Sequence, residues 1–218
     1  MRLSIVLRTG VLIADVLFAA LSLGAQTPDT QTKEALGMPP RTAPAEYQAQ
    51  AKVGSVTIAA EFMGHAVPTP QATFSSEEYV AVETGVFGTP EARIKLAIED
   101  FSLRINGKKA PLSSQPYELV FKSLKDPDWE PPAKEKSKTS FGTGGDKGDA
   151  APAPVHMPIE LRRVMEQRVQ KASLPGGERA LPQAGLIFFQ FRGKTENIRS
   201  LELLYDGPAG KATLTLQP

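Results

Sequence analysis

Hydrophobic and polar residues alternate most regularly near the end of the chain, between residues 184 and 218. Residues 211–217 follow a period of two, which indicates a strand with one buried and one solvent-facing side. Residues 201–205 show the same pattern, and the sequence DGPAG at 206–210 favours a tight reversal between the two segments. The pattern therefore predicts a C-terminal antiparallel hairpin.

The segment Leu186 to Phe191 is also predicted to be a strand, but it is apolar on both sides. Ile187 and Phe189 alternate with Leu186 and Phe188, so each face carries at least two large apolar side chains. Such a strand needs apolar cover on both faces. Other parts of the chain must supply that cover.

One amphipathic helix is predicted over residues 159–172, because its apolar positions recur with helical spacing after Pro158. The break Pro175-Gly176-Gly177 ends it. We expect this helix to cover one face of strand 186–191. The contacts with Phe188 are expected to come from Leu161, Val164 and Met165.

Further strands are predicted upstream wherever apolar residues alternate with polar ones. Asn106-Gly107 supplies the positive φ angles of a tight hairpin turn. Residues 117–124 fit both a strand and a helical turn, and a short helix is favoured. The predicted upstream strands cover residues 56–62, 79–87, 93–99 and 101–105.

Two segments show neither the period of a strand nor that of a helix, and they are predicted to be disordered. Residues 26–50 are rich in Thr, Pro, Ala and Gln, which is typical of a solvated tether. Residues 125–157 combine proline, glycine and mixed charge, which is typical of a disordered insertion. The folded domain is therefore expected to cover residues 51–218. It is interrupted by this insertion and by the helix that follows the insertion.

The first 25 residues are typical of a signal peptide. Arg2 and Arg8 precede an apolar run, residues 11–23, which ends in the small residues Gly24 and Ala25. The run is short for a membrane span, so a retained anchor is the less favoured alternative. We therefore expect an exported protein, periplasmic or secreted, without stable membrane insertion after cleavage.

Composition narrows the possible partners and chemistry. The formal net charge is +1, which gives no reason to expect nucleic acid as a partner. The chain contains no cysteine, which rules out disulfides, thiolate metal sites and cysteine nucleophiles within this sequence. The partner is therefore expected to be an unknown protein or another component of the cell envelope.

Copper is the one metal for which the sequence offers suitable ligand types. Met63 lies two positions before His65, and His156 is followed by Met157, so thioether and imidazole groups are neighbours twice. A copper site needs three or more converging ligands. Ordinary loop residues are the favoured interpretation, and a periplasmic copper-binding protein remains the alternative.

Paired carboxylates occur at Glu77-Glu78, at Glu99-Asp100 and at Asp126-x-Asp128, and a hydrolase built from them is a weaker alternative. Solvated surface residues are the favoured interpretation, because such charges are rarely buried. The glycines at 142–145 lack the strand and helix that a phosphate loop requires. No catalytic, cofactor-binding or metal-ligating residue is assigned, and no cofactor is expected.

Three segments carry a resemblance to a known class of domains: FSLRINGK at 101–108, GLIFFQF at 185–191 and IRSLELLYDGPAGKATLTL at 198–216. Their order resembles the small exported bacterial immunoglobulin-like β-sandwich domains of unknown function. The resemblance implies an antiparallel β-sandwich, with one amphipathic helix and a disordered insertion added in this chain. It implies no functional residues, and a non-enzymatic binding or structural module of the bacterial cell envelope is the favoured function.

Export with cleavage near Ala25 is the first testable prediction. The intact mass of the exported protein should correspond to a chain that begins at about Gln26, because the basic, apolar and small-residue segments occur in the order that signal peptidase requires. Mass spectrometry of the exported fraction measures this directly. An exported chain that still carries Met1 would contradict the prediction.

Overall fold

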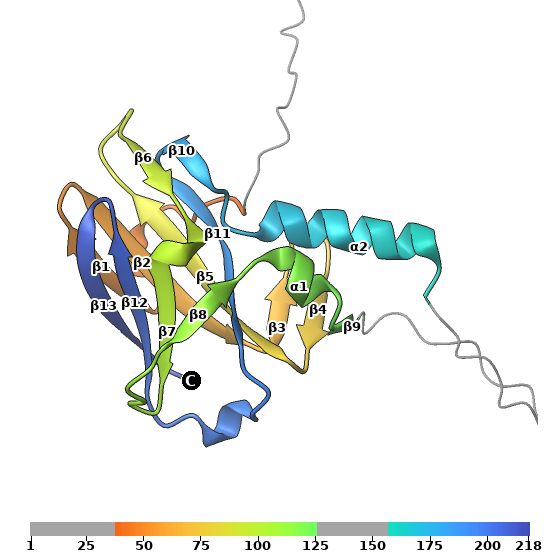
Figure 1. Ribbon diagram of the computed structural model, residues 1–218. Helices are drawn as coiled ribbons and strands as arrows, with labels where there is room; N and C mark the ends of the chain where they lie inside the picture. Colours follow the sequence, from red (N-terminus) through yellow and green to blue (C-terminus); the bar gives the residue numbers. More distant parts are fainter. Residues whose placement is uncertain (1–37, 126–156) are drawn as a thin grey trace, which may run out of the picture. The chain divides into compact units, whose positions relative to one another are not determined.

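Antiparallel strands are the predominant secondary structure of residues 38–125 and 157–218, which are the part of the chain that the computed structural model describes (Figure 1). Eight of them form one sheet, in which each strand pairs with the next in spatial order. This order is β1 (Ala49–Val53), β2 (Val56–Gly64), β5 (Tyr79–Phe87), β11 (Gln183–Gln190), β8 (Leu112–Gln115), β7 (Phe101–Ile105), β12 (Leu201–Gly207) and β13 (Gly210–Leu216).

This sheet curves until its first and last strands, β1 and β13, lie against each other. Beside them, the Gln48 side-chain amide donates a hydrogen bond of 2.9 Å to the carbonyl oxygen of Gln217. The short strand β8 pairs with β11 on one side and with β7 on the other, so it joins the two halves of the sheet. The strands therefore form one nearly closed, barrel-like sheet, and the expected immunoglobulin-like sandwich of two sheets is not confirmed.

Smaller elements lie outside this sheet. A three-stranded sheet is ordered β3 (Ala66–Pro68), β4 (Thr73–Ser76) and β9 (Leu124–Lys125), and a two-stranded sheet joins β6 (Arg93–Leu96) to β10 (Gly177–Ala180). The helices are α1 (Tyr117–Phe121) and α2 (Ile159–Ala172). The described residues also contain the short 3₁₀ turns η1 (Pro44–Glu46), η2 (Ile98–Asp100) and η3 (Thr195–Asn197).

The main core lies inside the curved sheet. It contains the inward-facing residues of the sheet, each of which alternates with a residue on the outer side. Full burial of each large apolar side chain contributes about 1.5–3 kcal/mol. The largest of these side chains belong to Ile58, Phe101, Leu103, Ile187, Phe189, Leu201, Leu203 and Leu214.

A second core covers the outer face of β5 and β11. Leu186 and Phe188 of β11 are buried there together with three residues of α2: Met165, Val169 and Ala172. The prediction that α2 covers Phe188 is confirmed, as is the two-sided burial of β11. Val67 and Phe74, from the small sheet beside α2, complete this layer.

The predicted contacts of α2 are only partly correct. Met165 is buried as expected, but Leu161 is 49% exposed and Val164 is 42% exposed. Figure 1 shows why, because the N-terminal half of α2 extends beyond the strands and only its later turns lie over the sheet. Burial therefore shifts along the helix from Leu161 and Val164 to Val169 and Ala172.

Gly185 allows the end of α2 to lie directly on β11. The backbone N–H of Leu174 donates a hydrogen bond of 3.0 Å to the carbonyl oxygen of Leu186, and Ser173 forms a parallel bridge to the same residue. A Cβ atom at Gly185 would collide with the backbone of Leu174. This close approach fixes the position at which the C-terminal end of α2 meets β11.

Residues 38–48 also pack on the sheet, in contrast to the tether expected over residues 26–50. Glu61 and Glu83 face each other on β2 and β5, and Arg41 forms ion pairs with both carboxylates. The hydrogen bond with Glu83 raises the pKa of Arg41. Like charges opposite each other in a sheet are destabilising, so Arg41 neutralises an otherwise unfavourable pair.

Tyr47 accounts for the glycine within β5. A Cβ atom at Gly85 would lie 2.7 Å from the Tyr47 hydroxyl, so the aromatic ring occupies the space of a side chain. The guanidinium of Arg41 lies 4.4 Å from the centre of the same ring. Of the other residues predicted to be disordered, 26–37 and 126–156 lie outside the described residues. Within the insertion expected over 125–157, Lys125 instead belongs to β9 and Met157 packs against the outer core.

The turn predictions agree with the structure. The hairpin of β12 and β13 reverses between Gly207 and Gly210, which are paired residues. Asn106 and Gly107 have φ angles of 53° and 64°. The strand that follows this turn begins at Leu112. Strand β6 ends at Leu96, before the expected residue 99, and pairs with β10 rather than within the main sheet.

The two-sided burial of β11 generates a stability prediction. Phe189→Ala should lower the free energy of unfolding by about 3–5 kcal/mol, because it leaves a cavity in the main core. Phe188→Ala should cost less and should mainly speed hydrogen exchange in α2, because it removes the surface on which α2 packs. Gln190→Ala, at an exposed position of the same strand, is the control. Unchanged protection of α2 in Phe188→Ala would contradict this assignment.

Arg41→Met tests the role of residues 38–48. It should lower the free energy of unfolding by about 2–3 kcal/mol, because Glu83 would stay buried without its partner. Arg93→Met is the matched control, since the ion pair of Arg93 with Glu178 is exposed and such pairs contribute only about 0–1 kcal/mol. Urea unfolding measures both. Equal losses in the two variants would show that the Arg41 contacts are ordinary surface pairs.

Candidate functional site

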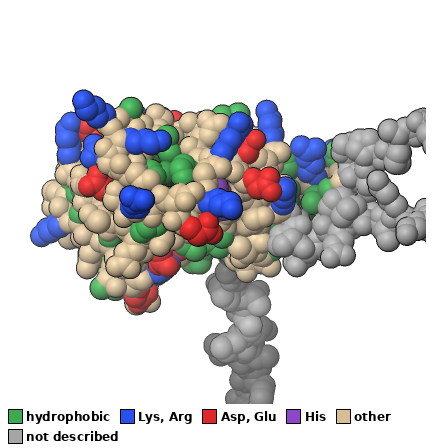
Figure 2. All heavy atoms as spheres, turned by 90° about the horizontal axis from the view of Figure 1, so that it is seen from below, with side chains coloured by type: hydrophobic (Ala, Val, Ile, Leu, Met, Phe, Trp, Pro, Cys, Tyr) green, Lys and Arg blue, Asp and Glu red, His purple; other side chains and the backbone are tan. Residues whose placement is uncertain are grey.

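A cleft of about 730 Å³ lies where three connections meet at one end of the sheet. Figure 2 shows this face, on which acidic and basic side chains are mixed around the small part of a histidine that reaches the surface. The lining comes from the β2–β3 turn, the β4–β5 turn, strand β9 and the β11–β12 connection. The lining residues are His65, Ser75, Ser76, Glu77, Glu78, Lys125, Arg192, Gly193, Lys194, Thr195 and Glu196.

The turn that holds His65 depends on the residue before it. Gly64 has a φ of +60°, a conformation that residues other than glycine rarely adopt. A Cβ atom there would lie 3.3 Å from the Thr195 methyl group, so the absence of a side chain also lets the β11–β12 connection approach. A bulge in the pairing of β2 with β5 immediately precedes this turn.

His65 joins two walls of the cleft. Its Nδ1 atom lies 2.9 Å from the carbonyl oxygen of Tyr79, and its Nε2 atom lies 2.8 Å from the carbonyl oxygen of Gly193. The ring also stacks on Phe191, with 6.2 Å between ring centres. Both ring nitrogens are therefore occupied by backbone groups, and the imidazole positions the β11–β12 connection.

Ser76 builds the opposite wall. Its hydroxyl oxygen accepts hydrogen bonds from the backbone N–H groups of Glu78 and Tyr79, at 3.2 and 3.1 Å. The same hydroxyl lies 3.0 Å from that of Ser123. Ser76 is only 2% exposed, so its hydroxyl orders the turn and is poorly placed to act as a nucleophile.

Two ion pairs cross the cleft. Lys125 Nζ lies 2.6 Å from a Glu77 oxygen, and Arg192 Nη2 lies 3.2 Å from a Glu78 oxygen. The hydrogen bond and charge of Lys125 lower the pKa of Glu77, so this carboxylate stays ionised to a lower pH than an isolated glutamate. The backbone also connects these walls, because Phe191 N–H donates to the Glu78 carbonyl oxygen at 2.8 Å.

Lys194 and Glu196 add one charge of each sign to the rim, and neither has an ion-pair partner among residues 38–125 and 157–218. The cleft therefore presents three cationic and three anionic side chains close together. Such a surface complements a ligand that carries both kinds of charge. A ligand with a single strong charge would meet repulsion from half of the charged lining.

The proposed copper ligands do not converge in the described part of the chain. Each nitrogen of His65 lies within 2.9 Å of a carbonyl oxygen, so copper would have to displace one of these two carbonyl groups. Met63 and Met157 pack against the outer core, and His156 lies outside the described residues. Within residues 38–125 and 157–218, no three His, Asp or Glu side chains are grouped so that they could hold a metal ion.

The carboxylate pairs have different surroundings. Glu77 and Glu78 line the cleft, whereas Glu99 and Asp100 lie in η2, away from that lining. Burial, followed by the nearby charge of Glu99, raises the pKa of Asp100. The pair Asp126-x-Asp128 lies outside the described residues.

Comparisons with known proteins give no family. No family model and no curated protein matches the chain. A solved structure from Bacillus subtilis, described as a "putative lipoprotein (ycdA)", aligns with 78% of this chain and 38% of its own, at 11% identity and a TM-score of 0.35. This chain thus spans well under two thirds of that protein, and the similarity is too low to support an argument about fold or function.

The two helices of the described residues do not have the features of a membrane-spanning helix. Neither α1 nor α2 has the length and apolar character needed to cross a bilayer.

Most of the cleft is not predictable from the sequence. Sequence patterns single out His65 as a possible copper ligand and Glu77-Glu78 as a possible catalytic carboxylate pair. They do not single out Lys125, Arg192 or the rim residues. The paired charges are 48 and 114 positions apart, so no local spacing connects them. The remaining signal is weaker: short polar clusters lie at the ends of predicted strands, where connections gather.

His65→Ala tests whether this side chain holds the cleft together. Hydrogen exchange in residues 191–197 should become faster, and the free energy of unfolding should fall by about 1–3 kcal/mol, because the ring that lies between the Tyr79 and Gly193 carbonyl groups is removed. Lys194→Ala is the control, since it removes a side chain from the same rim without removing an ion pair. If exchange in residues 191–197 is unchanged in His65→Ala, the ring does not position this connection.

Proposed function

We propose that the chain is an exported, non-enzymatic binding module of the bacterial cell envelope, and that the cleft around His65 binds a short segment of a partner protein. The observation that carries this proposal is the convergence of six charged side chains of both signs on one cleft. A peptide segment with acidic and basic residues matches such a lining. A volume of about 730 Å³ lies within the usual range for ligand sites, about 300–1,000 Å³.

The energetics of the ion pairs support binding. Lys125 and Glu77 are 62% and 77% exposed, and the pair of Arg192 with Glu78 is also largely exposed. Exposed pairs of this kind contribute only about 0–1 kcal/mol, so a ligand can replace them at little cost. The unpaired charges of Lys194 and Glu196 are available without any rearrangement within the described residues.

A non-enzymatic role is favoured by how the reactive side chains are used. Catalytic serine requires a general base within hydrogen-bond reach, but Ser76 contacts another hydroxyl and backbone N–H groups. His65 contacts only carbonyl oxygens through its nitrogens. Both side chains therefore fit a role in shaping the cleft. Copper binding is not proposed, because the available imidazole nitrogens already have backbone partners.

Export is supported by the sequence of the first 25 residues, with its basic, apolar and small-residue segments. Export would bring the cleft into contact with envelope proteins. Partner binding would then depend on the side chains that line the cleft.

Site-specific crosslinking in cells tests this proposal. A photoreactive amino acid at Lys194, on the rim, should yield one defined crosslinked partner. The same group at Lys211, whose side chain pairs with Asp206 away from the cleft, is the matched control and should yield none. Mass spectrometry of the Lys194 product identifies the partner and the segment that it contributes.

Charge reversal then separates specific binding from chance proximity. Arg192→Glu should abolish the crosslink from Lys194, because it replaces a cationic side chain of the cleft with a further carboxylate beside Glu78. Equal crosslinking from Lys194 and Lys211, or a Lys194 product that persists in Arg192→Glu, would show that the cleft is not the binding site.

A further inference from the structure

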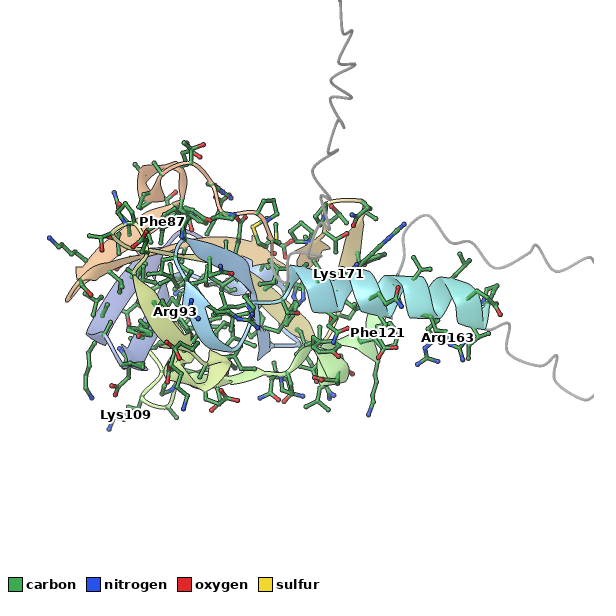
Figure 3. The ribbon with its side chains drawn as sticks, turned by 90° about the horizontal axis from the view of Figure 1, so that it is seen from above. Phe87, Arg93, Lys109, Phe121, Arg163 and Lys171 are labelled. Atoms are coloured by element: carbon green, nitrogen blue, oxygen red, sulfur yellow. The ribbon has the colours of Figure 1, made fainter. Side chains whose placement is uncertain are left out.

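The exposed apolar surface of the described residues is concentrated on the two helices. Leu119 of α1 and Ile159, Leu161 and Val164 of α2 are the large hydrophobic residues that remain exposed in this part of the chain, at 42–58%. The four side chains thus lie on elements that flank a single side of the sheet. Figures 1 and 3 agree that the N-terminal half of α2 projects beyond the strands, which leaves this half open to contact.

Leu161 and Val164 lie three positions apart and therefore on neighbouring parts of one helix face. Leu161 lies four positions before Met165, so it continues the row of Met165 and Val169 that packs on the sheet, whereas Val164 lies on the next row. Neither Leu161 nor Val164 belongs to the outer core. Both also lie apart from the side on which Arg162 contacts the ring of Phe121, at 5.4 Å from the ring centre. Leu161 and Val164 thus form an apolar patch that contributes to neither internal contact.

Charges of opposite sign lie at the two ends of this patch. Glu160 is four residues before Val164, and Arg168 is four residues after it. Residues spaced by four form one ridge on a helix surface. Neither Glu160 nor Arg168 has an ion-pair partner among residues 38–125 and 157–218. The ridge is therefore acidic at its N-terminal end, apolar at its centre and basic at its C-terminal end.

We propose that this ridge binds the same ridge of a second copy of the chain, in an antiparallel pair of α2 helices with the two-fold axis near Val164. A two-fold axis at this position places Glu160 of each copy near Arg168 of the other, because both residues are four positions from the centre. Ridges of this spacing pack together when two helices cross at about 50°. The Val164 side chains then meet at the centre of the contact.

Charge arrangement selects a second copy over other occupants. A helix that binds an anionic lipid surface has a polar face rich in lysine and arginine. α2 carries four basic residues (Arg162, Arg163, Arg168 and Lys171) and two acidic ones (Glu160 and Glu166), but at the ridge itself a glutamate stands at one end and the complementary arginine at the other. An antiparallel copy satisfies both charges with a single contact, whereas a uniformly charged partner satisfies one and repels the other.

The expected association is reversible. One ridge on each copy buries less than the roughly 1,200 Å² that stable interfaces reach at the lower limit. A monomer–dimer equilibrium that depends on protein concentration therefore follows. This contact does not involve the lining of the His65 cleft, so the two proposals can fail independently.

Sedimentation velocity of the purified protein over a range of concentrations tests the inference, with circular dichroism as the check on folding. The wild type should shift from monomer to dimer as concentration rises. Arg168→Glu and Glu160→Arg should each raise the dissociation constant by about tenfold or more, because each places like charges together. The double variant, Glu160→Arg with Arg168→Glu, should restore dimerisation, since the pairs reform with the charges exchanged.

Two further variants separate this ridge from the rest of α2. Val164→Asp should abolish the dimer, whereas Arg163→Glu, on another side of the helix, should leave it unchanged. A wild type that stays monomeric throughout, a dimer that persists in Val164→Asp, or a double variant that fails to recover would overturn the inference. So would a monomer that binds vesicles of anionic phospholipid and loses that binding equally in Arg163→Glu and Arg168→Glu.

Discussion

The structure depends on one pair of strands that is buried on both faces. In β5 and β11, side chains on one face enter the main core, through Val82, Ile187 and Phe189, while Leu186 and Phe188 on the other face enter the outer core. Strands with two apolar faces are stable only when both are covered. The curved sheet covers one face, and α2 with the small sheet covers the other. Loss of either layer would expose large apolar side chains of the same two strands.

This arrangement also determines where the molecule can bind partners. The connections at the ends of β5 and β11 carry the polar residues of the cleft, since backbone and side chains there are not needed for the core. His65 then fixes the β11–β12 connection through two backbone carbonyl groups. On the outer layer, α2 is longer than the surface it covers, so its first turns remain exposed. The cleft and the exposed ridge are thus two consequences of covering the same strand pair.

The sequence predicts the local structure well wherever one periodicity dominates. The C-terminal hairpin, the turn at Asn106-Gly107 and the cover of Phe188 by a helix follow from spacing and turn chemistry within short segments. The closure of the sheet is not predictable in this way, because it depends on the pairing of β8 with β11, a strand that follows much later in the chain. The packing of residues 38–48 on the sheet is also not predictable, because it depends on Arg41, which neutralises two carboxylates from different strands. The cleft depends on contacts of the same long-range kind, so its residues share no sequence motif.

Native-state hydrogen exchange tests the central role of β5 and β11 most directly. The backbone amides of these two strands should be the slowest to exchange, with an opening free energy equal to that of global unfolding measured by denaturant, because neither strand can separate without exposing both cores. The amides of α2 and of residues 38–48 should exchange through smaller openings. If the hairpin of β12 and β13 is instead the most protected, while β5 and β11 exchange through partial opening, the two-sided strand pair is not the element on which the fold depends.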